Sequence, residues 1–278
     1  GGTQSGYELL KSMGHTVTKL FPVLVQIKTD PTYVKALKGV RADGAVLVER
    51  NGKVLAENEG EIQFTDFGVS GPAIFEISRA ISTGKGPMTI HLNLMRSLNH
   101  DEVVSILHNR KKMMPNQTLE NFLTGILHNR LGRTILRYAG FGFTDPIHTL
   151  KSSDIKRIAH AIQDFEIPVI SAMGFDAAQV TAGGIRTEEF NPKTMESYLV
   201  PNLYAAGEVL DIDGDCGGFN LMFAFGMFAW RAFSSTIARL GFIAGSEPPR
   251  AAIAIWFPIL VKSAPRLAST TAFWRLVV

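Results

Sequence analysis

The sequence predicts an α/β protein in which a small antiparallel β unit is followed by a layer of helices. Asn51-Gly52, the strongest short-range signal for a β-hairpin, separates two strand-like segments, 45–50 and 53–57. Apolar residues then recur at the helical spacing of three and four in residues 99–108, 118–131 and 153–162. Short apolar strands return at 167–171, 178–180 and 203–206.

The composition is that of a globular protein with about two domains. The chain has 278 residues, of which 46% are hydrophobic and 19% are charged, which excludes a disordered chain and a coiled coil. The net charge of +3 is small, and the basic residues near the C-terminal end are too sparse for a nucleic-acid-binding patch. We therefore expect no nucleic-acid partner.

The cysteine content and the hydropathy indicate a cytoplasmic protein. Cys216 is the only cysteine, so no intrachain disulfide can form, and a reducing compartment is the simple inference. The sequence shows no signal peptide, and its most apolar run, 251–261, is too short to span a bilayer. We expect a soluble protein without a membrane partner.

The most informative segment runs from residue 203 to residue 221. A short apolar strand ends at Gly207-Glu208, and Gly217-Gly218 then lead into an apolar segment of helical length. Glycines let a backbone approach a ligand closely, and the free N–H groups at a helix start favour negative charge. The Glu208 carboxylate can accept hydrogen bonds from sugar-like hydroxyls. A flavin requires this chemistry around its ribityl and pyrophosphate groups, although ordinary strand–turn–helix connections share the pattern.

Other reactive residues are better explained as structural. Cys216 lies near a helix start, where a thiol pKa can fall, but it has no C-x-x-C partner, so a packing role is favoured. The seven histidines show neither H-x-x-x-H nor H-E-x-x-H spacing, so the sequence predicts no metal site. Ser70 lacks the first glycine of G-x-S-x-G at the required place and is interpreted as a helix cap. No catalytic residue is identified.

Four stretches resemble, in the same order, one family of bacterial flavoproteins. They are GGTQSGYELLKSMGH at 1–15, FTDFGVSGP at 64–72, VTAGGI at 180–185 with NPKTMES at 191–197, and YAAGEVLDIDGDCGGFN at 204–220. The family is the YhiN-type, or BaiN-like, flavoproteins, usually described as NAD(P)/FAD-dependent oxidoreductases. Any one motif alone is weak evidence, whereas four in order are strong.

The resemblance implies a Rossmann-type FAD-binding domain that is interrupted by a β-barrel-plus-helices insertion domain. Residues 1–17 and 165–240 would form the FAD-binding domain, and residues 18–164 the insertion. Residues 241–278 show no clean period, and the sequence leaves open whether this tail is native. No G-x-G-x-x-G occurs, and the family's ADP-binding βαβ unit would precede Gly1. The FAD-binding domain is therefore expected to be incomplete.

The resemblance also implies which residues bind FAD. Gly207 and Glu208 would approach its ribityl and pyrophosphate groups. The flavin ring would be contacted by Thr181, Gly183 and Gly184 along one edge, and by backbone N–H groups of Gly217, Gly218, Phe219 and Asn220 at its pyrimidine edge. His15 would lie near the flavin segment, and Asp211 and Asp213 would order the turn. Asp66 stands where the family has a histidine, so no proton-transfer role is expected there.

The expected activity is hydride transfer from NAD(P)H through FAD to a small organic acceptor, such as a conjugated carbon–carbon double bond. The alternative is a fragment that binds no FAD and is inactive, or that acts as a binding or interaction module, because the missing ADP-binding unit would remove a major anchor. The sequence does not indicate the substrate, the preference for NADH or NADPH, or the oligomeric state.

Overall fold

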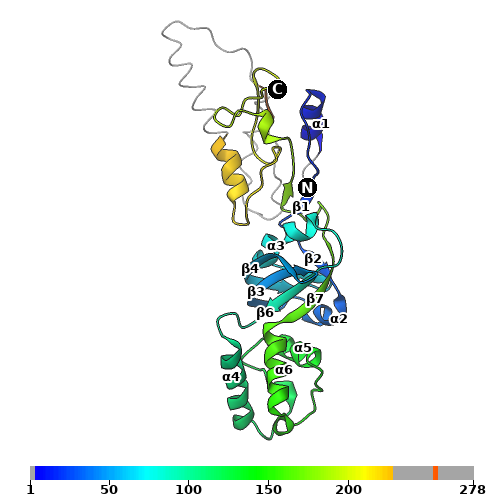
Figure 1. Ribbon diagram of the computed structural model, residues 1–278, viewed down its shortest axis with the longest axis vertical. Helices are drawn as coiled ribbons and strands as arrows, with labels where there is room; N and C mark the ends of the chain where they lie inside the picture. Colours follow the sequence, from blue (N-terminus) through cyan, green and yellow to red (C-terminus); the bar gives the residue numbers. More distant parts are fainter. Residues whose placement is uncertain (1–3, 228–252, 256–278) are drawn as a thin grey trace, which may run out of the picture. The chain divides into compact units, whose positions relative to one another are not determined.

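The structure is a computed structural model that describes residues 4–227 and 253–255 (Figure 1). The chain forms two compact units, each of which is described by itself. One is continuous, Pro22–Ala178, and the other combines Gly1–Phe21 with Gln179–Val278. Among the described residues, no helix has both the length and the apolar character needed to cross a membrane.

The continuous unit is built on a closed antiparallel barrel (Figure 1). Its strands, in their order around the barrel, are β2 (Ile27–Thr29), β5 (Gly68–Ser70), β4 (Lys53–Phe64), β3 (Arg41–Arg50), β6 (Thr89–Asn93) and β7 (Phe165–Ala172). The predicted hairpin is confirmed, since Asn51 and Gly52 join β3 to β4 with φ values of 53° and 77°. Positive φ at both turn residues matches the right-handed twist of the flanking strands.

Buried and more exposed residues alternate along the strands, and the buried ones form the barrel core. Val46 and Val48 on β3, and Ile90 and Leu92 on β6, are buried, while the residues between them are more exposed. Helix α3 (Pro72–Thr83) begins with a proline, which is tolerated at the first helical position, and adds apolar residues from one face to the same core. The short helices α2 (Pro31–Val34) and η1 (Lys35–Leu37) lie between β2 and β3 in the chain.

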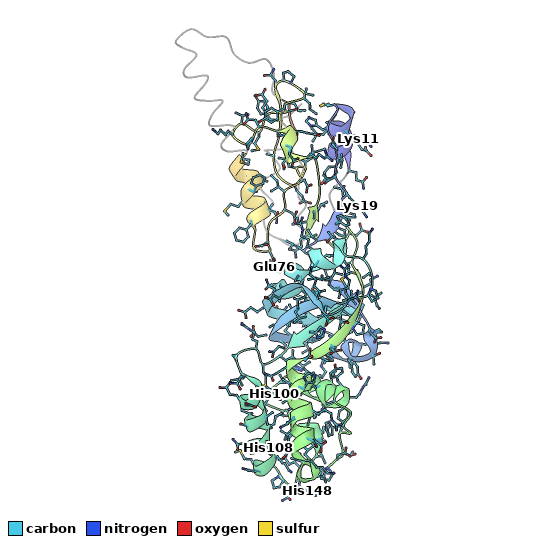
Figure 2. All side chains as sticks on the ribbon, viewed as in Figure 1. Lys11, Lys19, Glu76, His100, His108 and His148 are labelled. Atoms are coloured by element: carbon cyan, nitrogen blue, oxygen red, sulfur yellow. The ribbon has the colours of Figure 1, made fainter. Side chains whose placement is uncertain are left out.

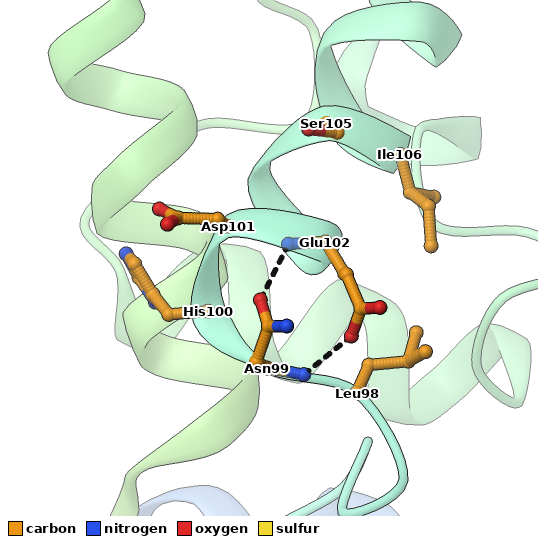
Figure 3. Close-up of a pocket in the computed structure, with 7 residues that line it drawn as sticks. All are labelled: Leu98, Asn99, His100, Asp101, Glu102, Ser105 and Ile106. Atoms are coloured by element: carbon orange, nitrogen blue, oxygen red, sulfur yellow. Dashed lines mark hydrogen bonds between the residues drawn. The ribbon is translucent and has the colours of Figure 1, made fainter.

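Three longer helices complete this unit: α4 (His100–Met113), α5 (Asn129–Tyr138) and α6 (Ser152–Gln163), with the 3₁₀ turns η2 (Leu119–Asn121) and η3 (Ile147–Thr149) between them. A capping box starts α4, because the Asn99 side chain accepts from Glu102 N at 3.0 Å and Asn99 N donates to the Glu102 carboxylate at 2.8 Å (Figure 3).

The prediction of one helix over residues 118–131 is wrong, because this segment contains η2 and only the start of α5. Its apolar spacing is interrupted by Gly125, whose φ of 82° is incompatible with a continuous helix.

The predicted barrel-plus-helices insertion is confirmed, but its expected end after residue 164 falls before the last barrel strand. β7 pairs with both β6 and β2, so the barrel cannot close without it. The compact unit accordingly continues to Ala178.

The second unit contains α1 (Ser5–Ser12), β8 (Val180–Ala182), η4 (Thr187–Glu189), β9 (Leu203–Ala205) and β10 (Ile253–Ile255), while β1 (Phe21–Val23) lies in the chain where the two units meet. β9 pairs with β10 in parallel, as in α/β sheets. Residues 219–227 are helical. The small core includes Leu10, Ile185 and Leu210. Of the expected tail, 241–278, all but β10 lies outside the described residues.

Closure of the barrel depends on the absence of a side chain at Gly68. A Cβ there would lie 2.0 Å from the Ile27 carbonyl oxygen, across the β2–β5 pair. We expect Gly68→Ala to lower the free energy of unfolding by about 3 kcal/mol, as measured by urea denaturation. The control is Gly174→Ala, because a Cβ at that exposed position would meet nothing within 4 Å. Equal unfolding midpoints for the two variants would contradict this account of closure.

Candidate functional site

In the second unit, the backbone of the turn after β8 packs directly against two other backbone segments, at Lys19 and at Leu210. A Cβ on Gly183 would lie 2.2 Å from the Lys19 carbonyl oxygen, and one on Gly184 would lie 2.6 Å from the carbonyl carbon of Leu210. Gly183 also has a φ of 88°, which L side chains rarely adopt. Both glycines are therefore required by the packing of the turn itself.

Thr18 links this turn to the acidic loop that follows β9. Its hydroxyl accepts from Gly184 N at 3.0 Å and donates to the Asp211 carboxylate at 2.9 Å, while its own N–H donates to the Gly184 carbonyl at 2.8 Å. Thr18 was not identified from the sequence, where nothing marks it out from other strand threonines. The bond from Thr18 also shows how Asp211 orders the turn, as expected.

Gly207 and Glu208 follow β9, and Glu208 contacts β8. Glu208 Oε1 accepts from Thr181 N at 2.7 Å, so these two predicted site residues lie together. Burial raises the pKa of the Glu208 carboxyl; the hydrogen bond from Thr181 acts in the opposite direction, and the charge of Asp213 raises the pKa further. Gly207 has a φ of 80°, and a Cβ there would lie 3.0 Å from the Cβ of Ala224 in the helical segment.

Tyr7 on α1 is a further residue of this site that the sequence did not single out. Its hydroxyl donates to the Glu208 carbonyl oxygen at 3.3 Å. Burial, together with the charges of Glu208 and Asp211, raises the pKa of Tyr7 to about 12. The phenol therefore stays protonated at neutral pH and remains a hydrogen-bond donor. The only signal in the sequence was its place in the first of the four motifs.

The loop before the helical segment is closed by the side chain of Asn220. Its amide nitrogen donates to the Gly214 carbonyl at 2.8 Å, and its amide oxygen accepts from Gly214 N at 2.7 Å. Gly217 and Gly218 lie inside this closed loop with φ values of 125° and 91°. Among the described residues, nothing would lie within 4 Å of a Cβ on Gly218, and Phe219 is 53% exposed, so the loop has an open face there.

His15 belongs to a separate buried cluster in the same unit. Its Nδ1 lies 2.9 Å from a Glu189 carboxylate oxygen, its Nε2 lies 3.0 Å from Ser197 Oγ, and its ring stacks on Phe190. The order Ser–His–Glu resembles a catalytic triad. However, Ser197 is buried, and its hydroxyl oxygen already accepts from the N–H groups of residues 199 and 200. The cluster of His15, Glu189, Phe190 and Ser197, named here the His15 clasp, therefore has a structural role, and Ser197 is not an activated nucleophile.

The clasp holds the segment that carries Thr18. Both oxygens of Glu189 accept from Thr16 N, and the Thr16 carbonyl accepts from Arg186 N at 3.0 Å. Burial raises the pKa of Glu189, but the hydrogen bonds from Thr16 and His15 outweigh it and hold the pKa below its ordinary value. Ionised Glu189 thus contributes to the position of residues 15–18.

A surface hollow at the start of α4 does not contain a group of polar side chains like that around Glu208 (Figure 3). Asn99 and Glu102 line it, but their polar groups are engaged in the capping box. The remaining lining residues are Leu98, His100, Asp101, Ser105 and Ile106. The hollow therefore offers no convergent set of polar groups for a ligand.

The clasp makes the fold sensitive to acid. A carboxyl whose folded pKa is lowered stabilises the fold above its ordinary pKa of 4.5 and loses that contribution as the pH falls through the folded value. We expect the urea midpoint of the wild type to fall between pH 6 and about pH 3, and Glu189→Gln to show a shallower fall.

Asp66→Asn is the control for this acid sensitivity. Asp66 also has a lowered pKa, through Lys38, but that pair is solvent-exposed and contributes little to stability. The account is contradicted if Asp66→Asn flattens the pH profile as much as Glu189→Gln does.

Comparison with known proteins agrees with the architecture. Residues 21–180 match the family described as "HI0933-like protein barrel and H2TH domain". The 3-dehydro-bile acid delta(4,6)-reductase of Clostridium scindens is 36% identical over 237 residues, which are 84% of this chain and 58% of that protein.

Two further relatives are ribosomal RNA dihydrouridine synthases. The Escherichia coli protein is 29% identical over 86% of this chain, and the Haemophilus influenzae protein is 28% identical over 81%. The chain spans 57% and 54% of their lengths, so it covers little more than half of each of the three relatives. The family match covers more than half of the chain, and the four sequence motifs predicted the same assignment: the chain belongs to the HI0933-like, or BaiN-like, family.

Proposed function

We propose that this chain is the flavin-binding and substrate-facing part of an FAD-dependent reductase. The reaction is hydride transfer from NAD(P)H through FAD to a conjugated carbon–carbon double bond of a small organic molecule. Relatives named as a reductase and as dihydrouridine synthases support reductive chemistry. The chain covers little more than half of the length of these proteins.

The observation that carries the proposal is the convergence of three glycine turns in one unit. Hydrogen bonds join the first two: Thr18 connects Gly184 to the loop of Asp211, and Glu208, after β9, bonds Thr181 on β8. Gly207 in turn packs against Ala224 of the helical segment that follows the third turn. Among these turns, the one at Gly217-Gly218 presents an open face. Glycine turns near a helix start, beside a carboxylate, fit a ligand that carries both phosphates and hydroxyl groups.

The residues present fit FAD in the following way. One Glu208 oxygen is bonded to Thr181 N, which leaves the other to accept from a ribityl hydroxyl. Backbone N–H groups at Gly217–Asn220 are the donors for the pyrimidine edge of the flavin ring. The packing of Gly183 and Gly184 already explains why they lack side chains, and their place at the flavin edge stays a prediction. Bound FAD would supply the hydride chemistry, and the protein would supply binding, orientation and electrostatics.

Three cations of the helical layer are engaged within the protein, which favours a small-molecule substrate over RNA. Arg110 donates to the Phe122 and Thr124 carbonyls, Lys111 to the Leu150 carbonyl, and Arg137 to the Thr32 carbonyl. These side chains are engaged in holding loops against helices. They therefore do not form a free patch for phosphate contacts of the kind that nucleic-acid binding requires.

Glu208→Gln tests the role of the site in FAD binding. The amide can still accept from Thr181 N, but the carboxylate charge is lost, so we expect the affinity for FAD to fall about tenfold. Flavin fluorescence during a titration measures this. Because burial raises the pKa of Glu208, ionisation at neutral pH opposes folding, and the variant should unfold at an equal or higher urea concentration.

The control is Glu188→Gln, which removes an exposed carboxylate of the same unit. Unchanged FAD affinity in Glu208→Gln would exclude the role of Glu208. A wild-type chain that stays colourless with excess FAD would instead support the alternative of an FAD-free fragment or binding module.

The activity is tested with flavin-loaded protein, by measuring the oxidation of NADH and of NADPH. A conjugated steroid ketone is the electron acceptor in one assay, and an RNA transcript is the acceptor in the comparison assay.

A further inference from the structure

Metal-ligating side chains converge on the outer face of the barrel, in the unit that does not contain the glycine turns. His91 on β6 lies directly opposite Glu166 on β7, and Asp164 follows the end of α6. One potential ligand atom from each of the three lies within 4.8 Å of those of the other two. The neighbours of His91, Ile90 and Leu92, are buried in the core, so His91 points to the opposite face.

Both ring nitrogens of His91 face carboxylates. Nδ1 lies 2.7 Å from Asp164 Oδ1, and Nε2 lies 3.4 Å from a Glu49 oxygen on β3. Nε2 is buried and makes no hydrogen bond with the described residues. A second histidine, His160 on the last turn of α6, has its Nε2 3.8 Å from the other Asp164 oxygen and a side chain that is 68% exposed.

The charge at this place is not balanced by lysine or arginine. Within the described part of the chain, the ion pairs of Glu49 and Asp164 involve histidine alone, and Glu166 has none. The imidazole of His91 and the carboxylates of Asp164 and Glu166 form a mixed nitrogen and oxygen donor set. Such a set favours Zn²⁺ and similar transition metals over Mg²⁺ and Ca²⁺, which prefer oxygen ligands alone.

We propose that His91 Nδ1, Asp164 and Glu166 bind one divalent transition-metal ion of the Zn²⁺ type. Glu49 is the positioning residue: its carboxylate, 3.4 Å from Nε2, favours the tautomer that carries the proton on Nε2 and leaves Nδ1 free for the metal. Carboxylate–histidine–metal arrangements of this kind are usual in zinc sites. The ion connects β6, β7 and α6, and thereby joins the barrel to its helices.

The sequence predicted no metal site because its signal is not local. His91 and Asp164 are 73 residues apart. Only the register of the β6–β7 pair brings Glu166 opposite His91.

Titration calorimetry of the full chain, after treatment with a chelator, tests the site with Zn²⁺, Mn²⁺ and Mg²⁺. We expect one saturable Zn²⁺ site, weaker Mn²⁺ binding and no Mg²⁺ binding at the same concentrations. His91→Gln and Glu166→Gln should weaken Zn²⁺ binding at least tenfold, and Glu49→Gln about tenfold. His108→Gln on α4 is the control, because this histidine is not part of the cluster (Figure 2).

Two results would overturn the assignment. One is the absence of saturable Zn²⁺ binding up to ~100 μM, which would show that His91, Asp164 and Glu49 only contact one another and hold no ion. The other is equal Zn²⁺ affinity in the wild type, His91→Gln and Glu166→Gln, which would show adventitious binding elsewhere. Glu166 is exposed, so Glu166→Gln keeps the test decisive if His91→Gln does not fold.

Discussion

The close approach of Gly183 and Gly184 to other backbone segments is the constraint on which the candidate site depends. No side chain fits at either position, because Lys19 and Leu210 occupy the space where a Cβ would lie. This packing allows the hydroxyl of Thr18 to bond both Gly184 and Asp211. The turn after β8 and the acidic loop after β9 are thereby held in one arrangement, with Glu208 bonded to Thr181 beside them.

The polar groups of this unit divide into two sets with different physical roles. The His15 clasp is buried, and its hydrogen bonds are satisfied within the protein, so it contributes to structure. The Gly217-Gly218 loop is closed by Asn220 but has an open face, and the Glu208 carboxyl has its pKa raised by burial. A half-buried carboxylate with a remaining acceptor site is unfavourable in the free protein, and under the proposed function a ligand hydroxyl would relieve this.

Local signals in the sequence predicted local structure well. Asn51-Gly52 identified the β3–β4 hairpin, and the motifs identified the barrel-plus-helices insertion. Local sequence patterns could not predict the closure of the barrel, because the pairing of β7 with β2 joins residues far apart in the chain. The same limit applies to the site: Thr18 and Tyr7 reach it through tertiary contacts. The helix expected at 118–131 failed because one positive-φ glycine, Gly125, outweighed the apolar spacing.

Under the proposed function, the glycine turns form the FAD-binding surface. Hydrogen–deuterium exchange of the chain with and without FAD, read peptide by peptide, tests it most directly. The account predicts that FAD slows exchange in peptides that cover 181–184 and 207–220 and leaves the barrel strands unchanged. Protection confined to the barrel and its helices, or no change at the glycine turns when FAD is bound, would contradict it.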